Sequence, residues 1–115
     1  MTTRQQSGQA AEAKAWEYLQ AQGFRLLARN YRLRGGEIDL IVHDGDYLVF
    51  VEVRYRSSEQ FGGALQSIDL RKQQRIIRTA QHYLMRHALD LPCRFDVIAL
   101  DRAQQITWLK NAFEA

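Results

Sequence analysis

Hydrophobic positions recur along this chain with two periods, one typical of helices and the other of strands. Helical spacing covers residues 8–22 and again residues 69–88, where Asp69 is a candidate N-cap. Alternation typical of strands predicts five of them, over residues 24–33, 37–43, 46–56, 94–100 and 105–109, the last being short. The order α-β-β-β-α-β, closed by that short strand, favours an α/β fold in which helices flank a mixed sheet.

The connections between these elements carry their own signals. The Asp44-Gly45 dipeptide predicts a two-residue hairpin turn after the second strand. Serines and glycines gather between residues 57 and 68, which predicts a flexible loop before the second helix.

Length and composition narrow the class of protein. The 115 residues, 46% hydrophobic and 25% charged, suit one globular domain over residues 1–115. Cys93 is the single cysteine, which excludes an internal disulfide and gives no support for a structural zinc site. The first residues are polar, and the longest apolar run, residues 47–51, is far too short to cross a bilayer. We therefore expect a cytoplasmic protein with no membrane contact.

Acidic side chains mark the predicted hairpin. A two-residue turn at Asp44-Gly45 sets Asp39 opposite Phe50. It also sets Glu37 opposite Glu52, so that Asp39 and Glu52 become diagonal neighbours on one face. A three-residue turn would put them on opposite faces, so the prediction depends on the register.

Like charges on paired strands repel, so such a cluster needs positive charge nearby. One interpretation is a polar patch neutralised by Arg54 and other arginines. The other is a divalent metal ion, and carboxylates without a histidine or cysteine partner favour magnesium or manganese. Glu12, at the border of the apolar face of the first helix, can either point at this cluster or be solvated.

The order of these residues resembles the D…ExK signature of the PD-(D/E)xK nuclease superfamily, with Asp39 followed by Glu52-Val53-Arg54. Over roughly residues 8–109 the chain is similar to the bacterial YraN-type family. The matching segments are Gly8…Ala11-Glu12, residues 36–41, residues 50–54, the helix from Lys72 to Leu84, and residues 94–97. That family is described as uncharacterised, with predicted endonuclease activity and distant similarity to archaeal Holliday junction resolvases.

The resemblance implies a restriction-endonuclease-like core and a metal-dependent endonuclease acting on structured or branched DNA. Carried over residue by residue, it makes Asp39 and Glu52 ligands of magnesium or manganese, with the Val53 carbonyl as a third. Glu12 corresponds to the acid that resolvase-like members place on their first helix. Such an ion would polarise the scissile phosphate and activate a water for attack.

One position departs from the superfamily pattern. A lysine usually ends the ExK motif, and here the residue is Arg54. Arginine can hold a phosphate or orient a water, but it is too basic to act as a general base. Lys72, at the start of the second helix, is the alternative catalytic cation.

Positive charge is carried by 13 arginines and 3 lysines, with a net charge of +3. The second helix carries a basic stripe without acids, formed by Arg71, Arg75, Arg78, His82 and Arg86. Arg32 and Arg34 belong to a second acid-free run, between residues 25 and 34. These runs are typical of surfaces that bind phosphate backbones without reading bases, although a general bias towards arginine would also produce them.

Three classes of function remain open at this point. The first is the metal-dependent nuclease, which by analogy with resolvases would act as a homodimer on branched DNA. The second is a catalytically inactive nucleic-acid-binding module with the same fold, which the departure at Arg54 favours. The third is an adaptor whose basic stripe meets an acidic protein. Salt-sensitive DNA binding would separate the first two from the third.

Overall fold

The computed structural model describes residues 4–55 and 68–115. Its helices and strands are α1 (Arg4–Ala21), β1 (Arg25–Leu33), β2 (Gly36–Asp44), β3 (Tyr47–Tyr55), α2 (Leu70–Arg86), β4 (Cys93–Leu100) and β5 (Ile106–Phe113). The α/β fold class expected from the sequence is confirmed. The loop expected over residues 57–68 lies, apart from its last residue, outside the described residues.

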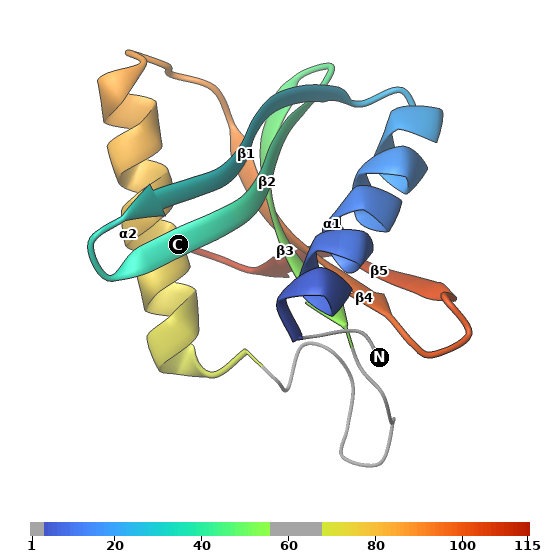
Figure 1. Cartoon of the computed structure of the whole chain (residues 1–115). Helices are drawn as coiled ribbons and strands as arrows, with labels where there is room; N and C mark the ends of the chain where they lie inside the picture. The colour runs from blue at the N-terminus through green and yellow to red at the C-terminus, as the bar shows by residue number, and fades with distance from the viewer. Residues whose placement is uncertain (1–3, 56–67) are drawn as a thin grey trace.

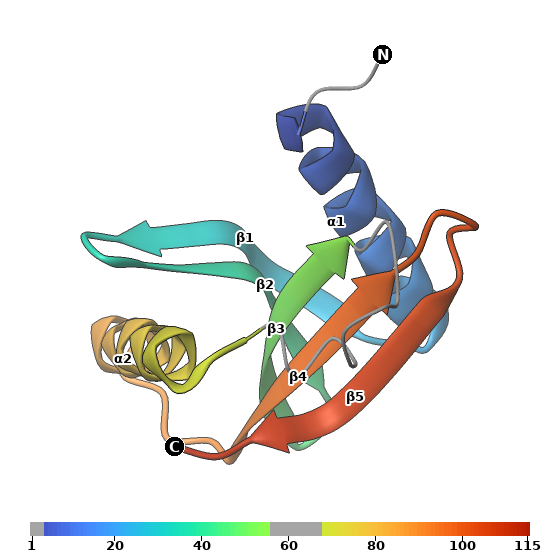
Figure 2. The same ribbon diagram turned by 90° about the horizontal axis from the view of Figure 1, so that it is seen from below.

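The five strands form one mixed sheet in the order β1-β2-β3-β4-β5. β3 and β4 are parallel, and every other neighbouring pair is antiparallel. The helices lie on opposite faces of this sheet (Figure 1). The sheet is strongly twisted, so that the β1–β2 hairpin extends away from β3 and passes over α2 (Figure 2). Within the described ranges, neither helix is long and apolar enough to cross a membrane.

Each helix closes its own hydrophobic core. The core under α1 consists mainly of small and branched residues, among them Ala11, Ala15, Leu19, Val49 and Val51. The core under α2 is richer in large side chains, among them Ile41, Phe50, Ile76, Tyr83 and Phe95. Alanines at helical spacing let α1 approach the sheet closely, as the predicted apolar face requires.

The last strand is longer than the sequence pattern indicated. β5 continues to Phe113, whose ring stacks on Phe95 with 5.0 Å between the ring centroids. Polar Lys110 and Asn111 interrupt the alternation just before this anchor, which is why the apolar pattern ended at residue 109.

The predicted register of the β2–β3 hairpin was wrong by two residues. The turn is Gly45-Asp46 rather than Asp44-Gly45, because Asp44 pairs with Tyr47. Phe50 therefore lies opposite Ile41 and not opposite Asp39. A shift of two preserves the face on which each side chain lies, since the side-chain period of a strand is two.

Gly36 fixes the tip of the β1–β2 hairpin to α2. A Cβ atom at this position would overlap the Oγ1 atom of Thr79 and lie 3.2 Å from the carbonyl oxygen of Arg75. That carbonyl already accepts a hydrogen bond from Thr79 Oγ1 at 2.8 Å. The close approach of backbone to helix therefore requires glycine.

Gly36→Ala should lower the free energy of unfolding by about 1–3 kcal/mol, the usual cost of overpacking a tight contact. Urea unfolding measures this loss. Gly8→Ala in α1 is the matched control, because a Cβ there meets nothing within 4 Å. The control should be unchanged or gain up to about 1 kcal/mol from better helix propensity. A Gly36→Ala protein as stable as the native chain would contradict the tight contact.

Candidate active site

The β2 and β3 strands separate at the position where the two acidic residues lie. Their pairing runs from Asp44–Tyr47 to Leu40–Val51, and Asp39 and Glu52 occupy the next position on each strand. There the backbone N–H of Val53 donates to Asp39 Oδ2 at 2.8 Å. The carboxylate thus accepts a backbone hydrogen bond where the ladder ends. Asp39 and Glu52 therefore face each other directly where the two strands separate. This places them closer together than the diagonal relation expected from the sequence.

Both carboxyl groups hold their protons more tightly than usual. Burial, and then the charge of Asp39, raises the pKa of Glu52 to about 8. Burial also raises the pKa of Asp39, although the Val53 N–H and a hydrogen bond with Glu52 act against this shift. Two carboxylates this close are difficult to ionise together without a nearby cation. Near neutral pH the pair therefore retains at least part of a proton.

Among the residues that the structure describes, two cations approach Glu52, and the one on α2 is nearer. Lys72 Nζ lies 3.3 Å from Glu52 Oε1, whereas Arg54 Nε lies 3.9 Å from the same oxygen. Asp69 caps α2 as predicted, accepting the backbone N–H of Lys72 at 2.8 Å. The cap thus fixes the backbone from which Lys72 reaches the carboxylate.

Glu12 faces the same region from α1. Burial, and then the charges of Asp39 and Glu37, raises the pKa of Glu12 to about 7. When the side-chain amide of Asn30 is oriented with its nitrogen towards the two glutamates, it donates to Glu12 Oε1 at 2.7 Å and to Glu37 Oε1 at 3.2 Å. Asn30 has a left-handed backbone, with φ of 50°, in β1 directly across from Asp39. Asparagine tolerates this conformation better than most residues.

The sequence pattern did not indicate that Asn30 belongs to the candidate site. It stands in a run of arginines, and nothing in the strand pattern distinguishes it from an ordinary surface residue. The left-handed conformation and the bridge between two elements arise only when α1 packs against the sheet.

The acidic pair opens into a cavity of about 380 Å³ between the hairpin and α2. The hairpin contributes Leu33, Gly35 and Gly36 to its wall, and α2 contributes Lys72, Arg75 and Ile76. Asp39 and Glu52 line it as well. Only 7% of the Glu52 side chain is exposed, so this acid lies deep in the cavity.

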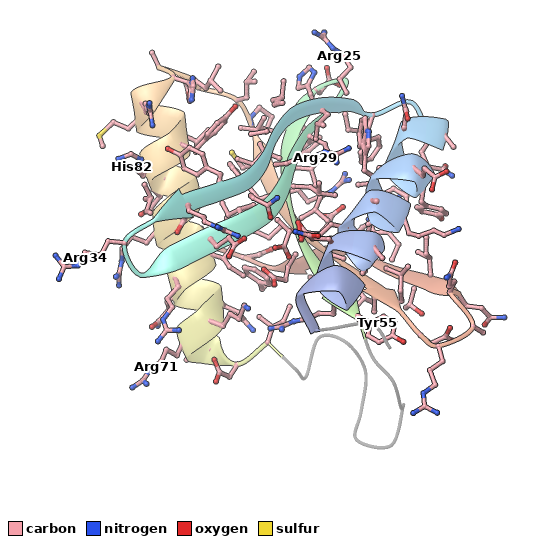
Figure 3. The ribbon with its side chains drawn as sticks, in the orientation of Figure 1. Arg25, Arg29, Arg34, Tyr55, Arg71 and His82 are labelled. Atoms are coloured by element: carbon pink, nitrogen blue, oxygen red, sulfur yellow. The ribbon has the colours of Figure 1, made fainter. Side chains whose placement is uncertain are left out.

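The arginines assigned to nucleic-acid binding lie around this cavity and along α2. Arg32 and Arg75 line the cavity, and Arg32 Nε pairs with Glu37 Oε1 at 3.2 Å. Arg34 at the hairpin tip and Arg71 at the start of α2 both point outward on one side of the molecule (Figure 3). The exposed arginines of the helix are Arg71, Arg75, Arg78 and Arg86.

His82 departs from the exposed stripe to which the sequence assigned it. The residue is half-buried, and its Nδ1 atom lies 2.9 Å from the hydroxyl of Tyr31 in a hydrogen bond. The helix turns this position slightly towards β1, so that the basic stripe is formed by arginines.

The donor set fits a hard divalent cation, with two carboxylates as its centre. In the parts of the chain that the structure describes, no three acidic, histidine or cysteine side chains converge as a metal site. Glu12 repels Asp39 electrostatically but does not complete such a cluster. Carboxylate and carbonyl oxygens with water as the remaining ligands are typical of magnesium sites. A cation that binds between Asp39 and Glu52 would displace the proton that their raised pKa values retain.

Comparison with known proteins identifies relatives along nearly the whole chain. Residues 11–100 match the model of a family described as uncharacterised protein family UPF0102. A UPF0102 protein of Janthinobacterium sp. (strain Marseille) is 58% identical over 114 residues, covering 99% of this chain and 92% of the relative. One from Pseudomonas fluorescens (strain Pf0-1) is 55% identical over 113 residues, covering 96% and 94% of the two chains. One from Stutzerimonas stutzeri (strain A1501) is 49% identical over 120 residues and covers both chains completely. The YraN-type resemblance noted in the sequence is thereby confirmed, and the chain belongs to the uncharacterised protein family UPF0102.

Proposed function

We propose that this protein is a metal-dependent endonuclease that hydrolyses phosphodiester bonds in structured DNA. The observation that carries the proposal is the pairing of half-buried Asp39 with buried Glu52 where β2 and β3 separate, with the pKa values of both carboxyl groups raised. A fold gains no stability from two acids that repel each other in a cavity, whereas a cation-binding site requires them.

The proposed metal ligands are Asp39, Glu52 and the carbonyl of Val53, and the ion is magnesium or manganese. When bound, such an ion lowers the pKa of a water and polarises a phosphate. Arg75 and Arg32, in the cavity wall, are placed to hold the phosphate oxygens. Glu12 has a pKa of about 7, which suits a group that accepts or returns a proton at neutral pH.

Lys72 is proposed as the catalytic cation that the ExK lysine supplies in the superfamily. It reaches Glu52 from α2, whereas Arg54 approaches the same carboxylate from β3 at a longer distance. An ammonium next to the acidic pair can stabilise negative charge that develops on the phosphate. Arg54 is assigned the lesser role of balancing the charge of Glu52.

Lys72→Met should slow cleavage about 10- to 100-fold, the usual effect of losing a group that supports a metal ligand. Single-turnover cleavage with manganese measures the rate. Lys14→Met, which removes an exposed lysine of α1, is the matched control and should leave the rate unchanged. Equal rates for Lys72→Met and the native chain would exclude Lys72 and return the role to Arg54.

DNA is the proposed partner because the cavity is surrounded by exposed arginines. Arginine suits bidentate contacts to phosphate, and its distribution over the hairpin tip and α2 favours contact with the backbone rather than with bases. Cutting two strands of a branched structure needs two such sites, which a homodimer would supply.

The test is a cleavage assay on single-stranded, duplex, flap and four-way DNA with magnesium or manganese. Cleavage that requires the ion and stops with EDTA is the expected result. Salt-sensitive DNA binding without cleavage under either ion would favour the second candidate, an inactive DNA-binding module, for which Arg54 in place of lysine is the supporting observation. The absence of both DNA binding and DNA cleavage would contradict both candidates.

A further inference from the structure

The acidic pair lies between two protruding walls and not on an open surface. One wall is the tip of the β1–β2 hairpin, with Leu33 and Gly36, and the other is the first half of α2, with Arg75 and Ile76. The contact of Gly36 with α2 holds the two walls together. In the part of the chain that the structure describes, the cavity leading to Glu52 lies between a two-stranded hairpin and a helix.

We infer that the substrate of this cavity is an unpaired DNA strand, so that the enzyme cuts where a strand has left the duplex. The inference rests on the proposed nuclease function and specifies its substrate. It differs from a preference for branched DNA as such, because a fully paired four-way junction offers few unpaired nucleotides.

The dimensions of the walls disfavour an intact duplex. Each backbone of a B-DNA duplex runs between a major groove about 12 Å wide and a minor groove about 6 Å wide. To bring a phosphate to the acids, one wall would have to enter each groove. A helix is about 10–12 Å across with its side chains, so α2 fits only the major groove.

The hairpin would then have to enter the minor groove. Its two backbones alone are about 4.8 Å apart, and the exposed side chains of Arg32 and Arg34 add to that width. Exchanging the two walls leaves the helix in the narrow groove, which fits less well. An unpaired strand has no grooves, and it can bend so that a single phosphate enters the cavity.

The arginines of α2 offer a path for the rest of such a strand. Arg75 lines the cavity, and the exposed stripe continues along the helix through Arg78 to Arg86. At 1.5 Å per residue, Arg75 and Arg86 are about 16 Å apart along the helix axis. A positive track beside the site holds a flexible backbone, as in proteins that bind single strands. The cavity wall includes no aromatic side chain among its described residues, so we expect little preference for particular bases.

The first test presents one labelled DNA strand in three forms: alone, fully paired, and half paired as a flap. With manganese, cutting should occur in the single strand and in the unpaired half. The paired form should be cut roughly a hundredfold more slowly, because opening two base-pair steps at about 1.4 kcal/mol each must precede cutting. Duplex cut as fast as the single strand would overturn the inference.

The second test needs no cleavage, so it separates this inference from the proposed function. Amide NMR signals of Gly35, Gly36 and Lys72 report on the cavity wall. A single strand added without metal should shift them, and a duplex of the same sequence should leave them in place. Such shifts without cleavage under any ion would contradict the nuclease proposal but support the strand preference. Equal shifts with both DNAs, or none with either, would overturn the preference.

A matched pair of variants tests whether the single strand follows the arginines of α2. Arg75→Ala should weaken binding of the single strand, whereas Arg102→Ala, in the turn between β4 and β5 and outside the cavity, should not. Equal losses from both variants would mean that the strand is held by net charge alone and would count against the path along α2.

Discussion

Glu52→Gln should reduce metal-dependent cleavage by more than about 10²-fold, because loss of a ligand should exceed the 10- to 100-fold cost of losing a supporting group. Glutamine keeps the size of the side chain but removes the charge that would hold the ion. The exposed Asp90, in the connection from α2 to β4, provides a matched control, since Asp90→Asn removes an acid without touching the cavity. Rates are measured at saturating manganese on the single-stranded substrate.

The same variant should become more stable than the native chain as the pH rises. The folded pKa of Glu52 is about 8 and its ordinary value is 4.5. Between these values the folded state retains a proton that the unfolded state has lost, so the native chain loses stability as the pH increases. The glutamine side chain of Glu52→Gln cannot ionise, so urea unfolding should show a difference that is small at pH 4 and grows up to about pH 8. Retained cleavage, or a difference that shrinks with pH, would contradict the assignment of Glu52.

Asp96→Ala should destabilise the fold by about 3–5 kcal/mol, the usual cost of breaking a buried charged network. Asp96 is 1% exposed. Its carboxylate accepts hydrogen bonds from Arg94 Nε and Trp108 Nε1, both at 2.9 Å, and from the backbone N–H of Asn111 at 2.9 Å. Arg94 Nη2 donates a further hydrogen bond to Asp96 Oδ2 at 3.1 Å, so alanine would leave four donors unsatisfied. Urea unfolding at pH 7 measures the loss.

The matched control for this prediction is Asp96→Asn, which keeps one acceptor oxygen and the shape of the side chain. It should recover part of the stability, while Asp90→Ala on the surface should cost within about 0.5 kcal/mol. Asp96 joins β4 to β5 on the α1 face and does not line the acidic cavity. A strong loss of cleavage in a folded Asp96→Asn protein would contradict this structural role.

The sequence predicted the elements of this fold well where local signals were strong. The apolar spacing of α1, the cap at Asp69 and the alternation of β2 and β3 all depend on neighbours within a few residues. The hairpin turn was displaced by one residue along the chain, because both Asp44-Gly45 and Gly45-Asp46 are acceptable turn pairs. The face of Asp39 and Glu52 was nevertheless predicted, since the resulting register shift was even.

The remaining parts of the candidate site depend on packing between distant segments. Whether Lys72 or Arg54 approaches Glu52 more closely depends on how α2 lies on the sheet, and the sequence left both open. The bridge made by Asn30 and the cavity between hairpin and helix have no local signature at all. The sequence pattern marked Gly36 only as part of a turn, although its main role is to let the hairpin contact α2.

The most direct test of the central claim is manganese binding by calorimetry at pH 7, in two buffers with different ionisation enthalpies. The native chain should bind one ion and release close to one proton, because Glu52, with a pKa of about 8, is largely protonated before the ion binds. Glu52→Gln should lose both the binding and the proton release. No binding by the native chain, or the same binding by Glu52→Gln, would contradict a metal site at Asp39 and Glu52.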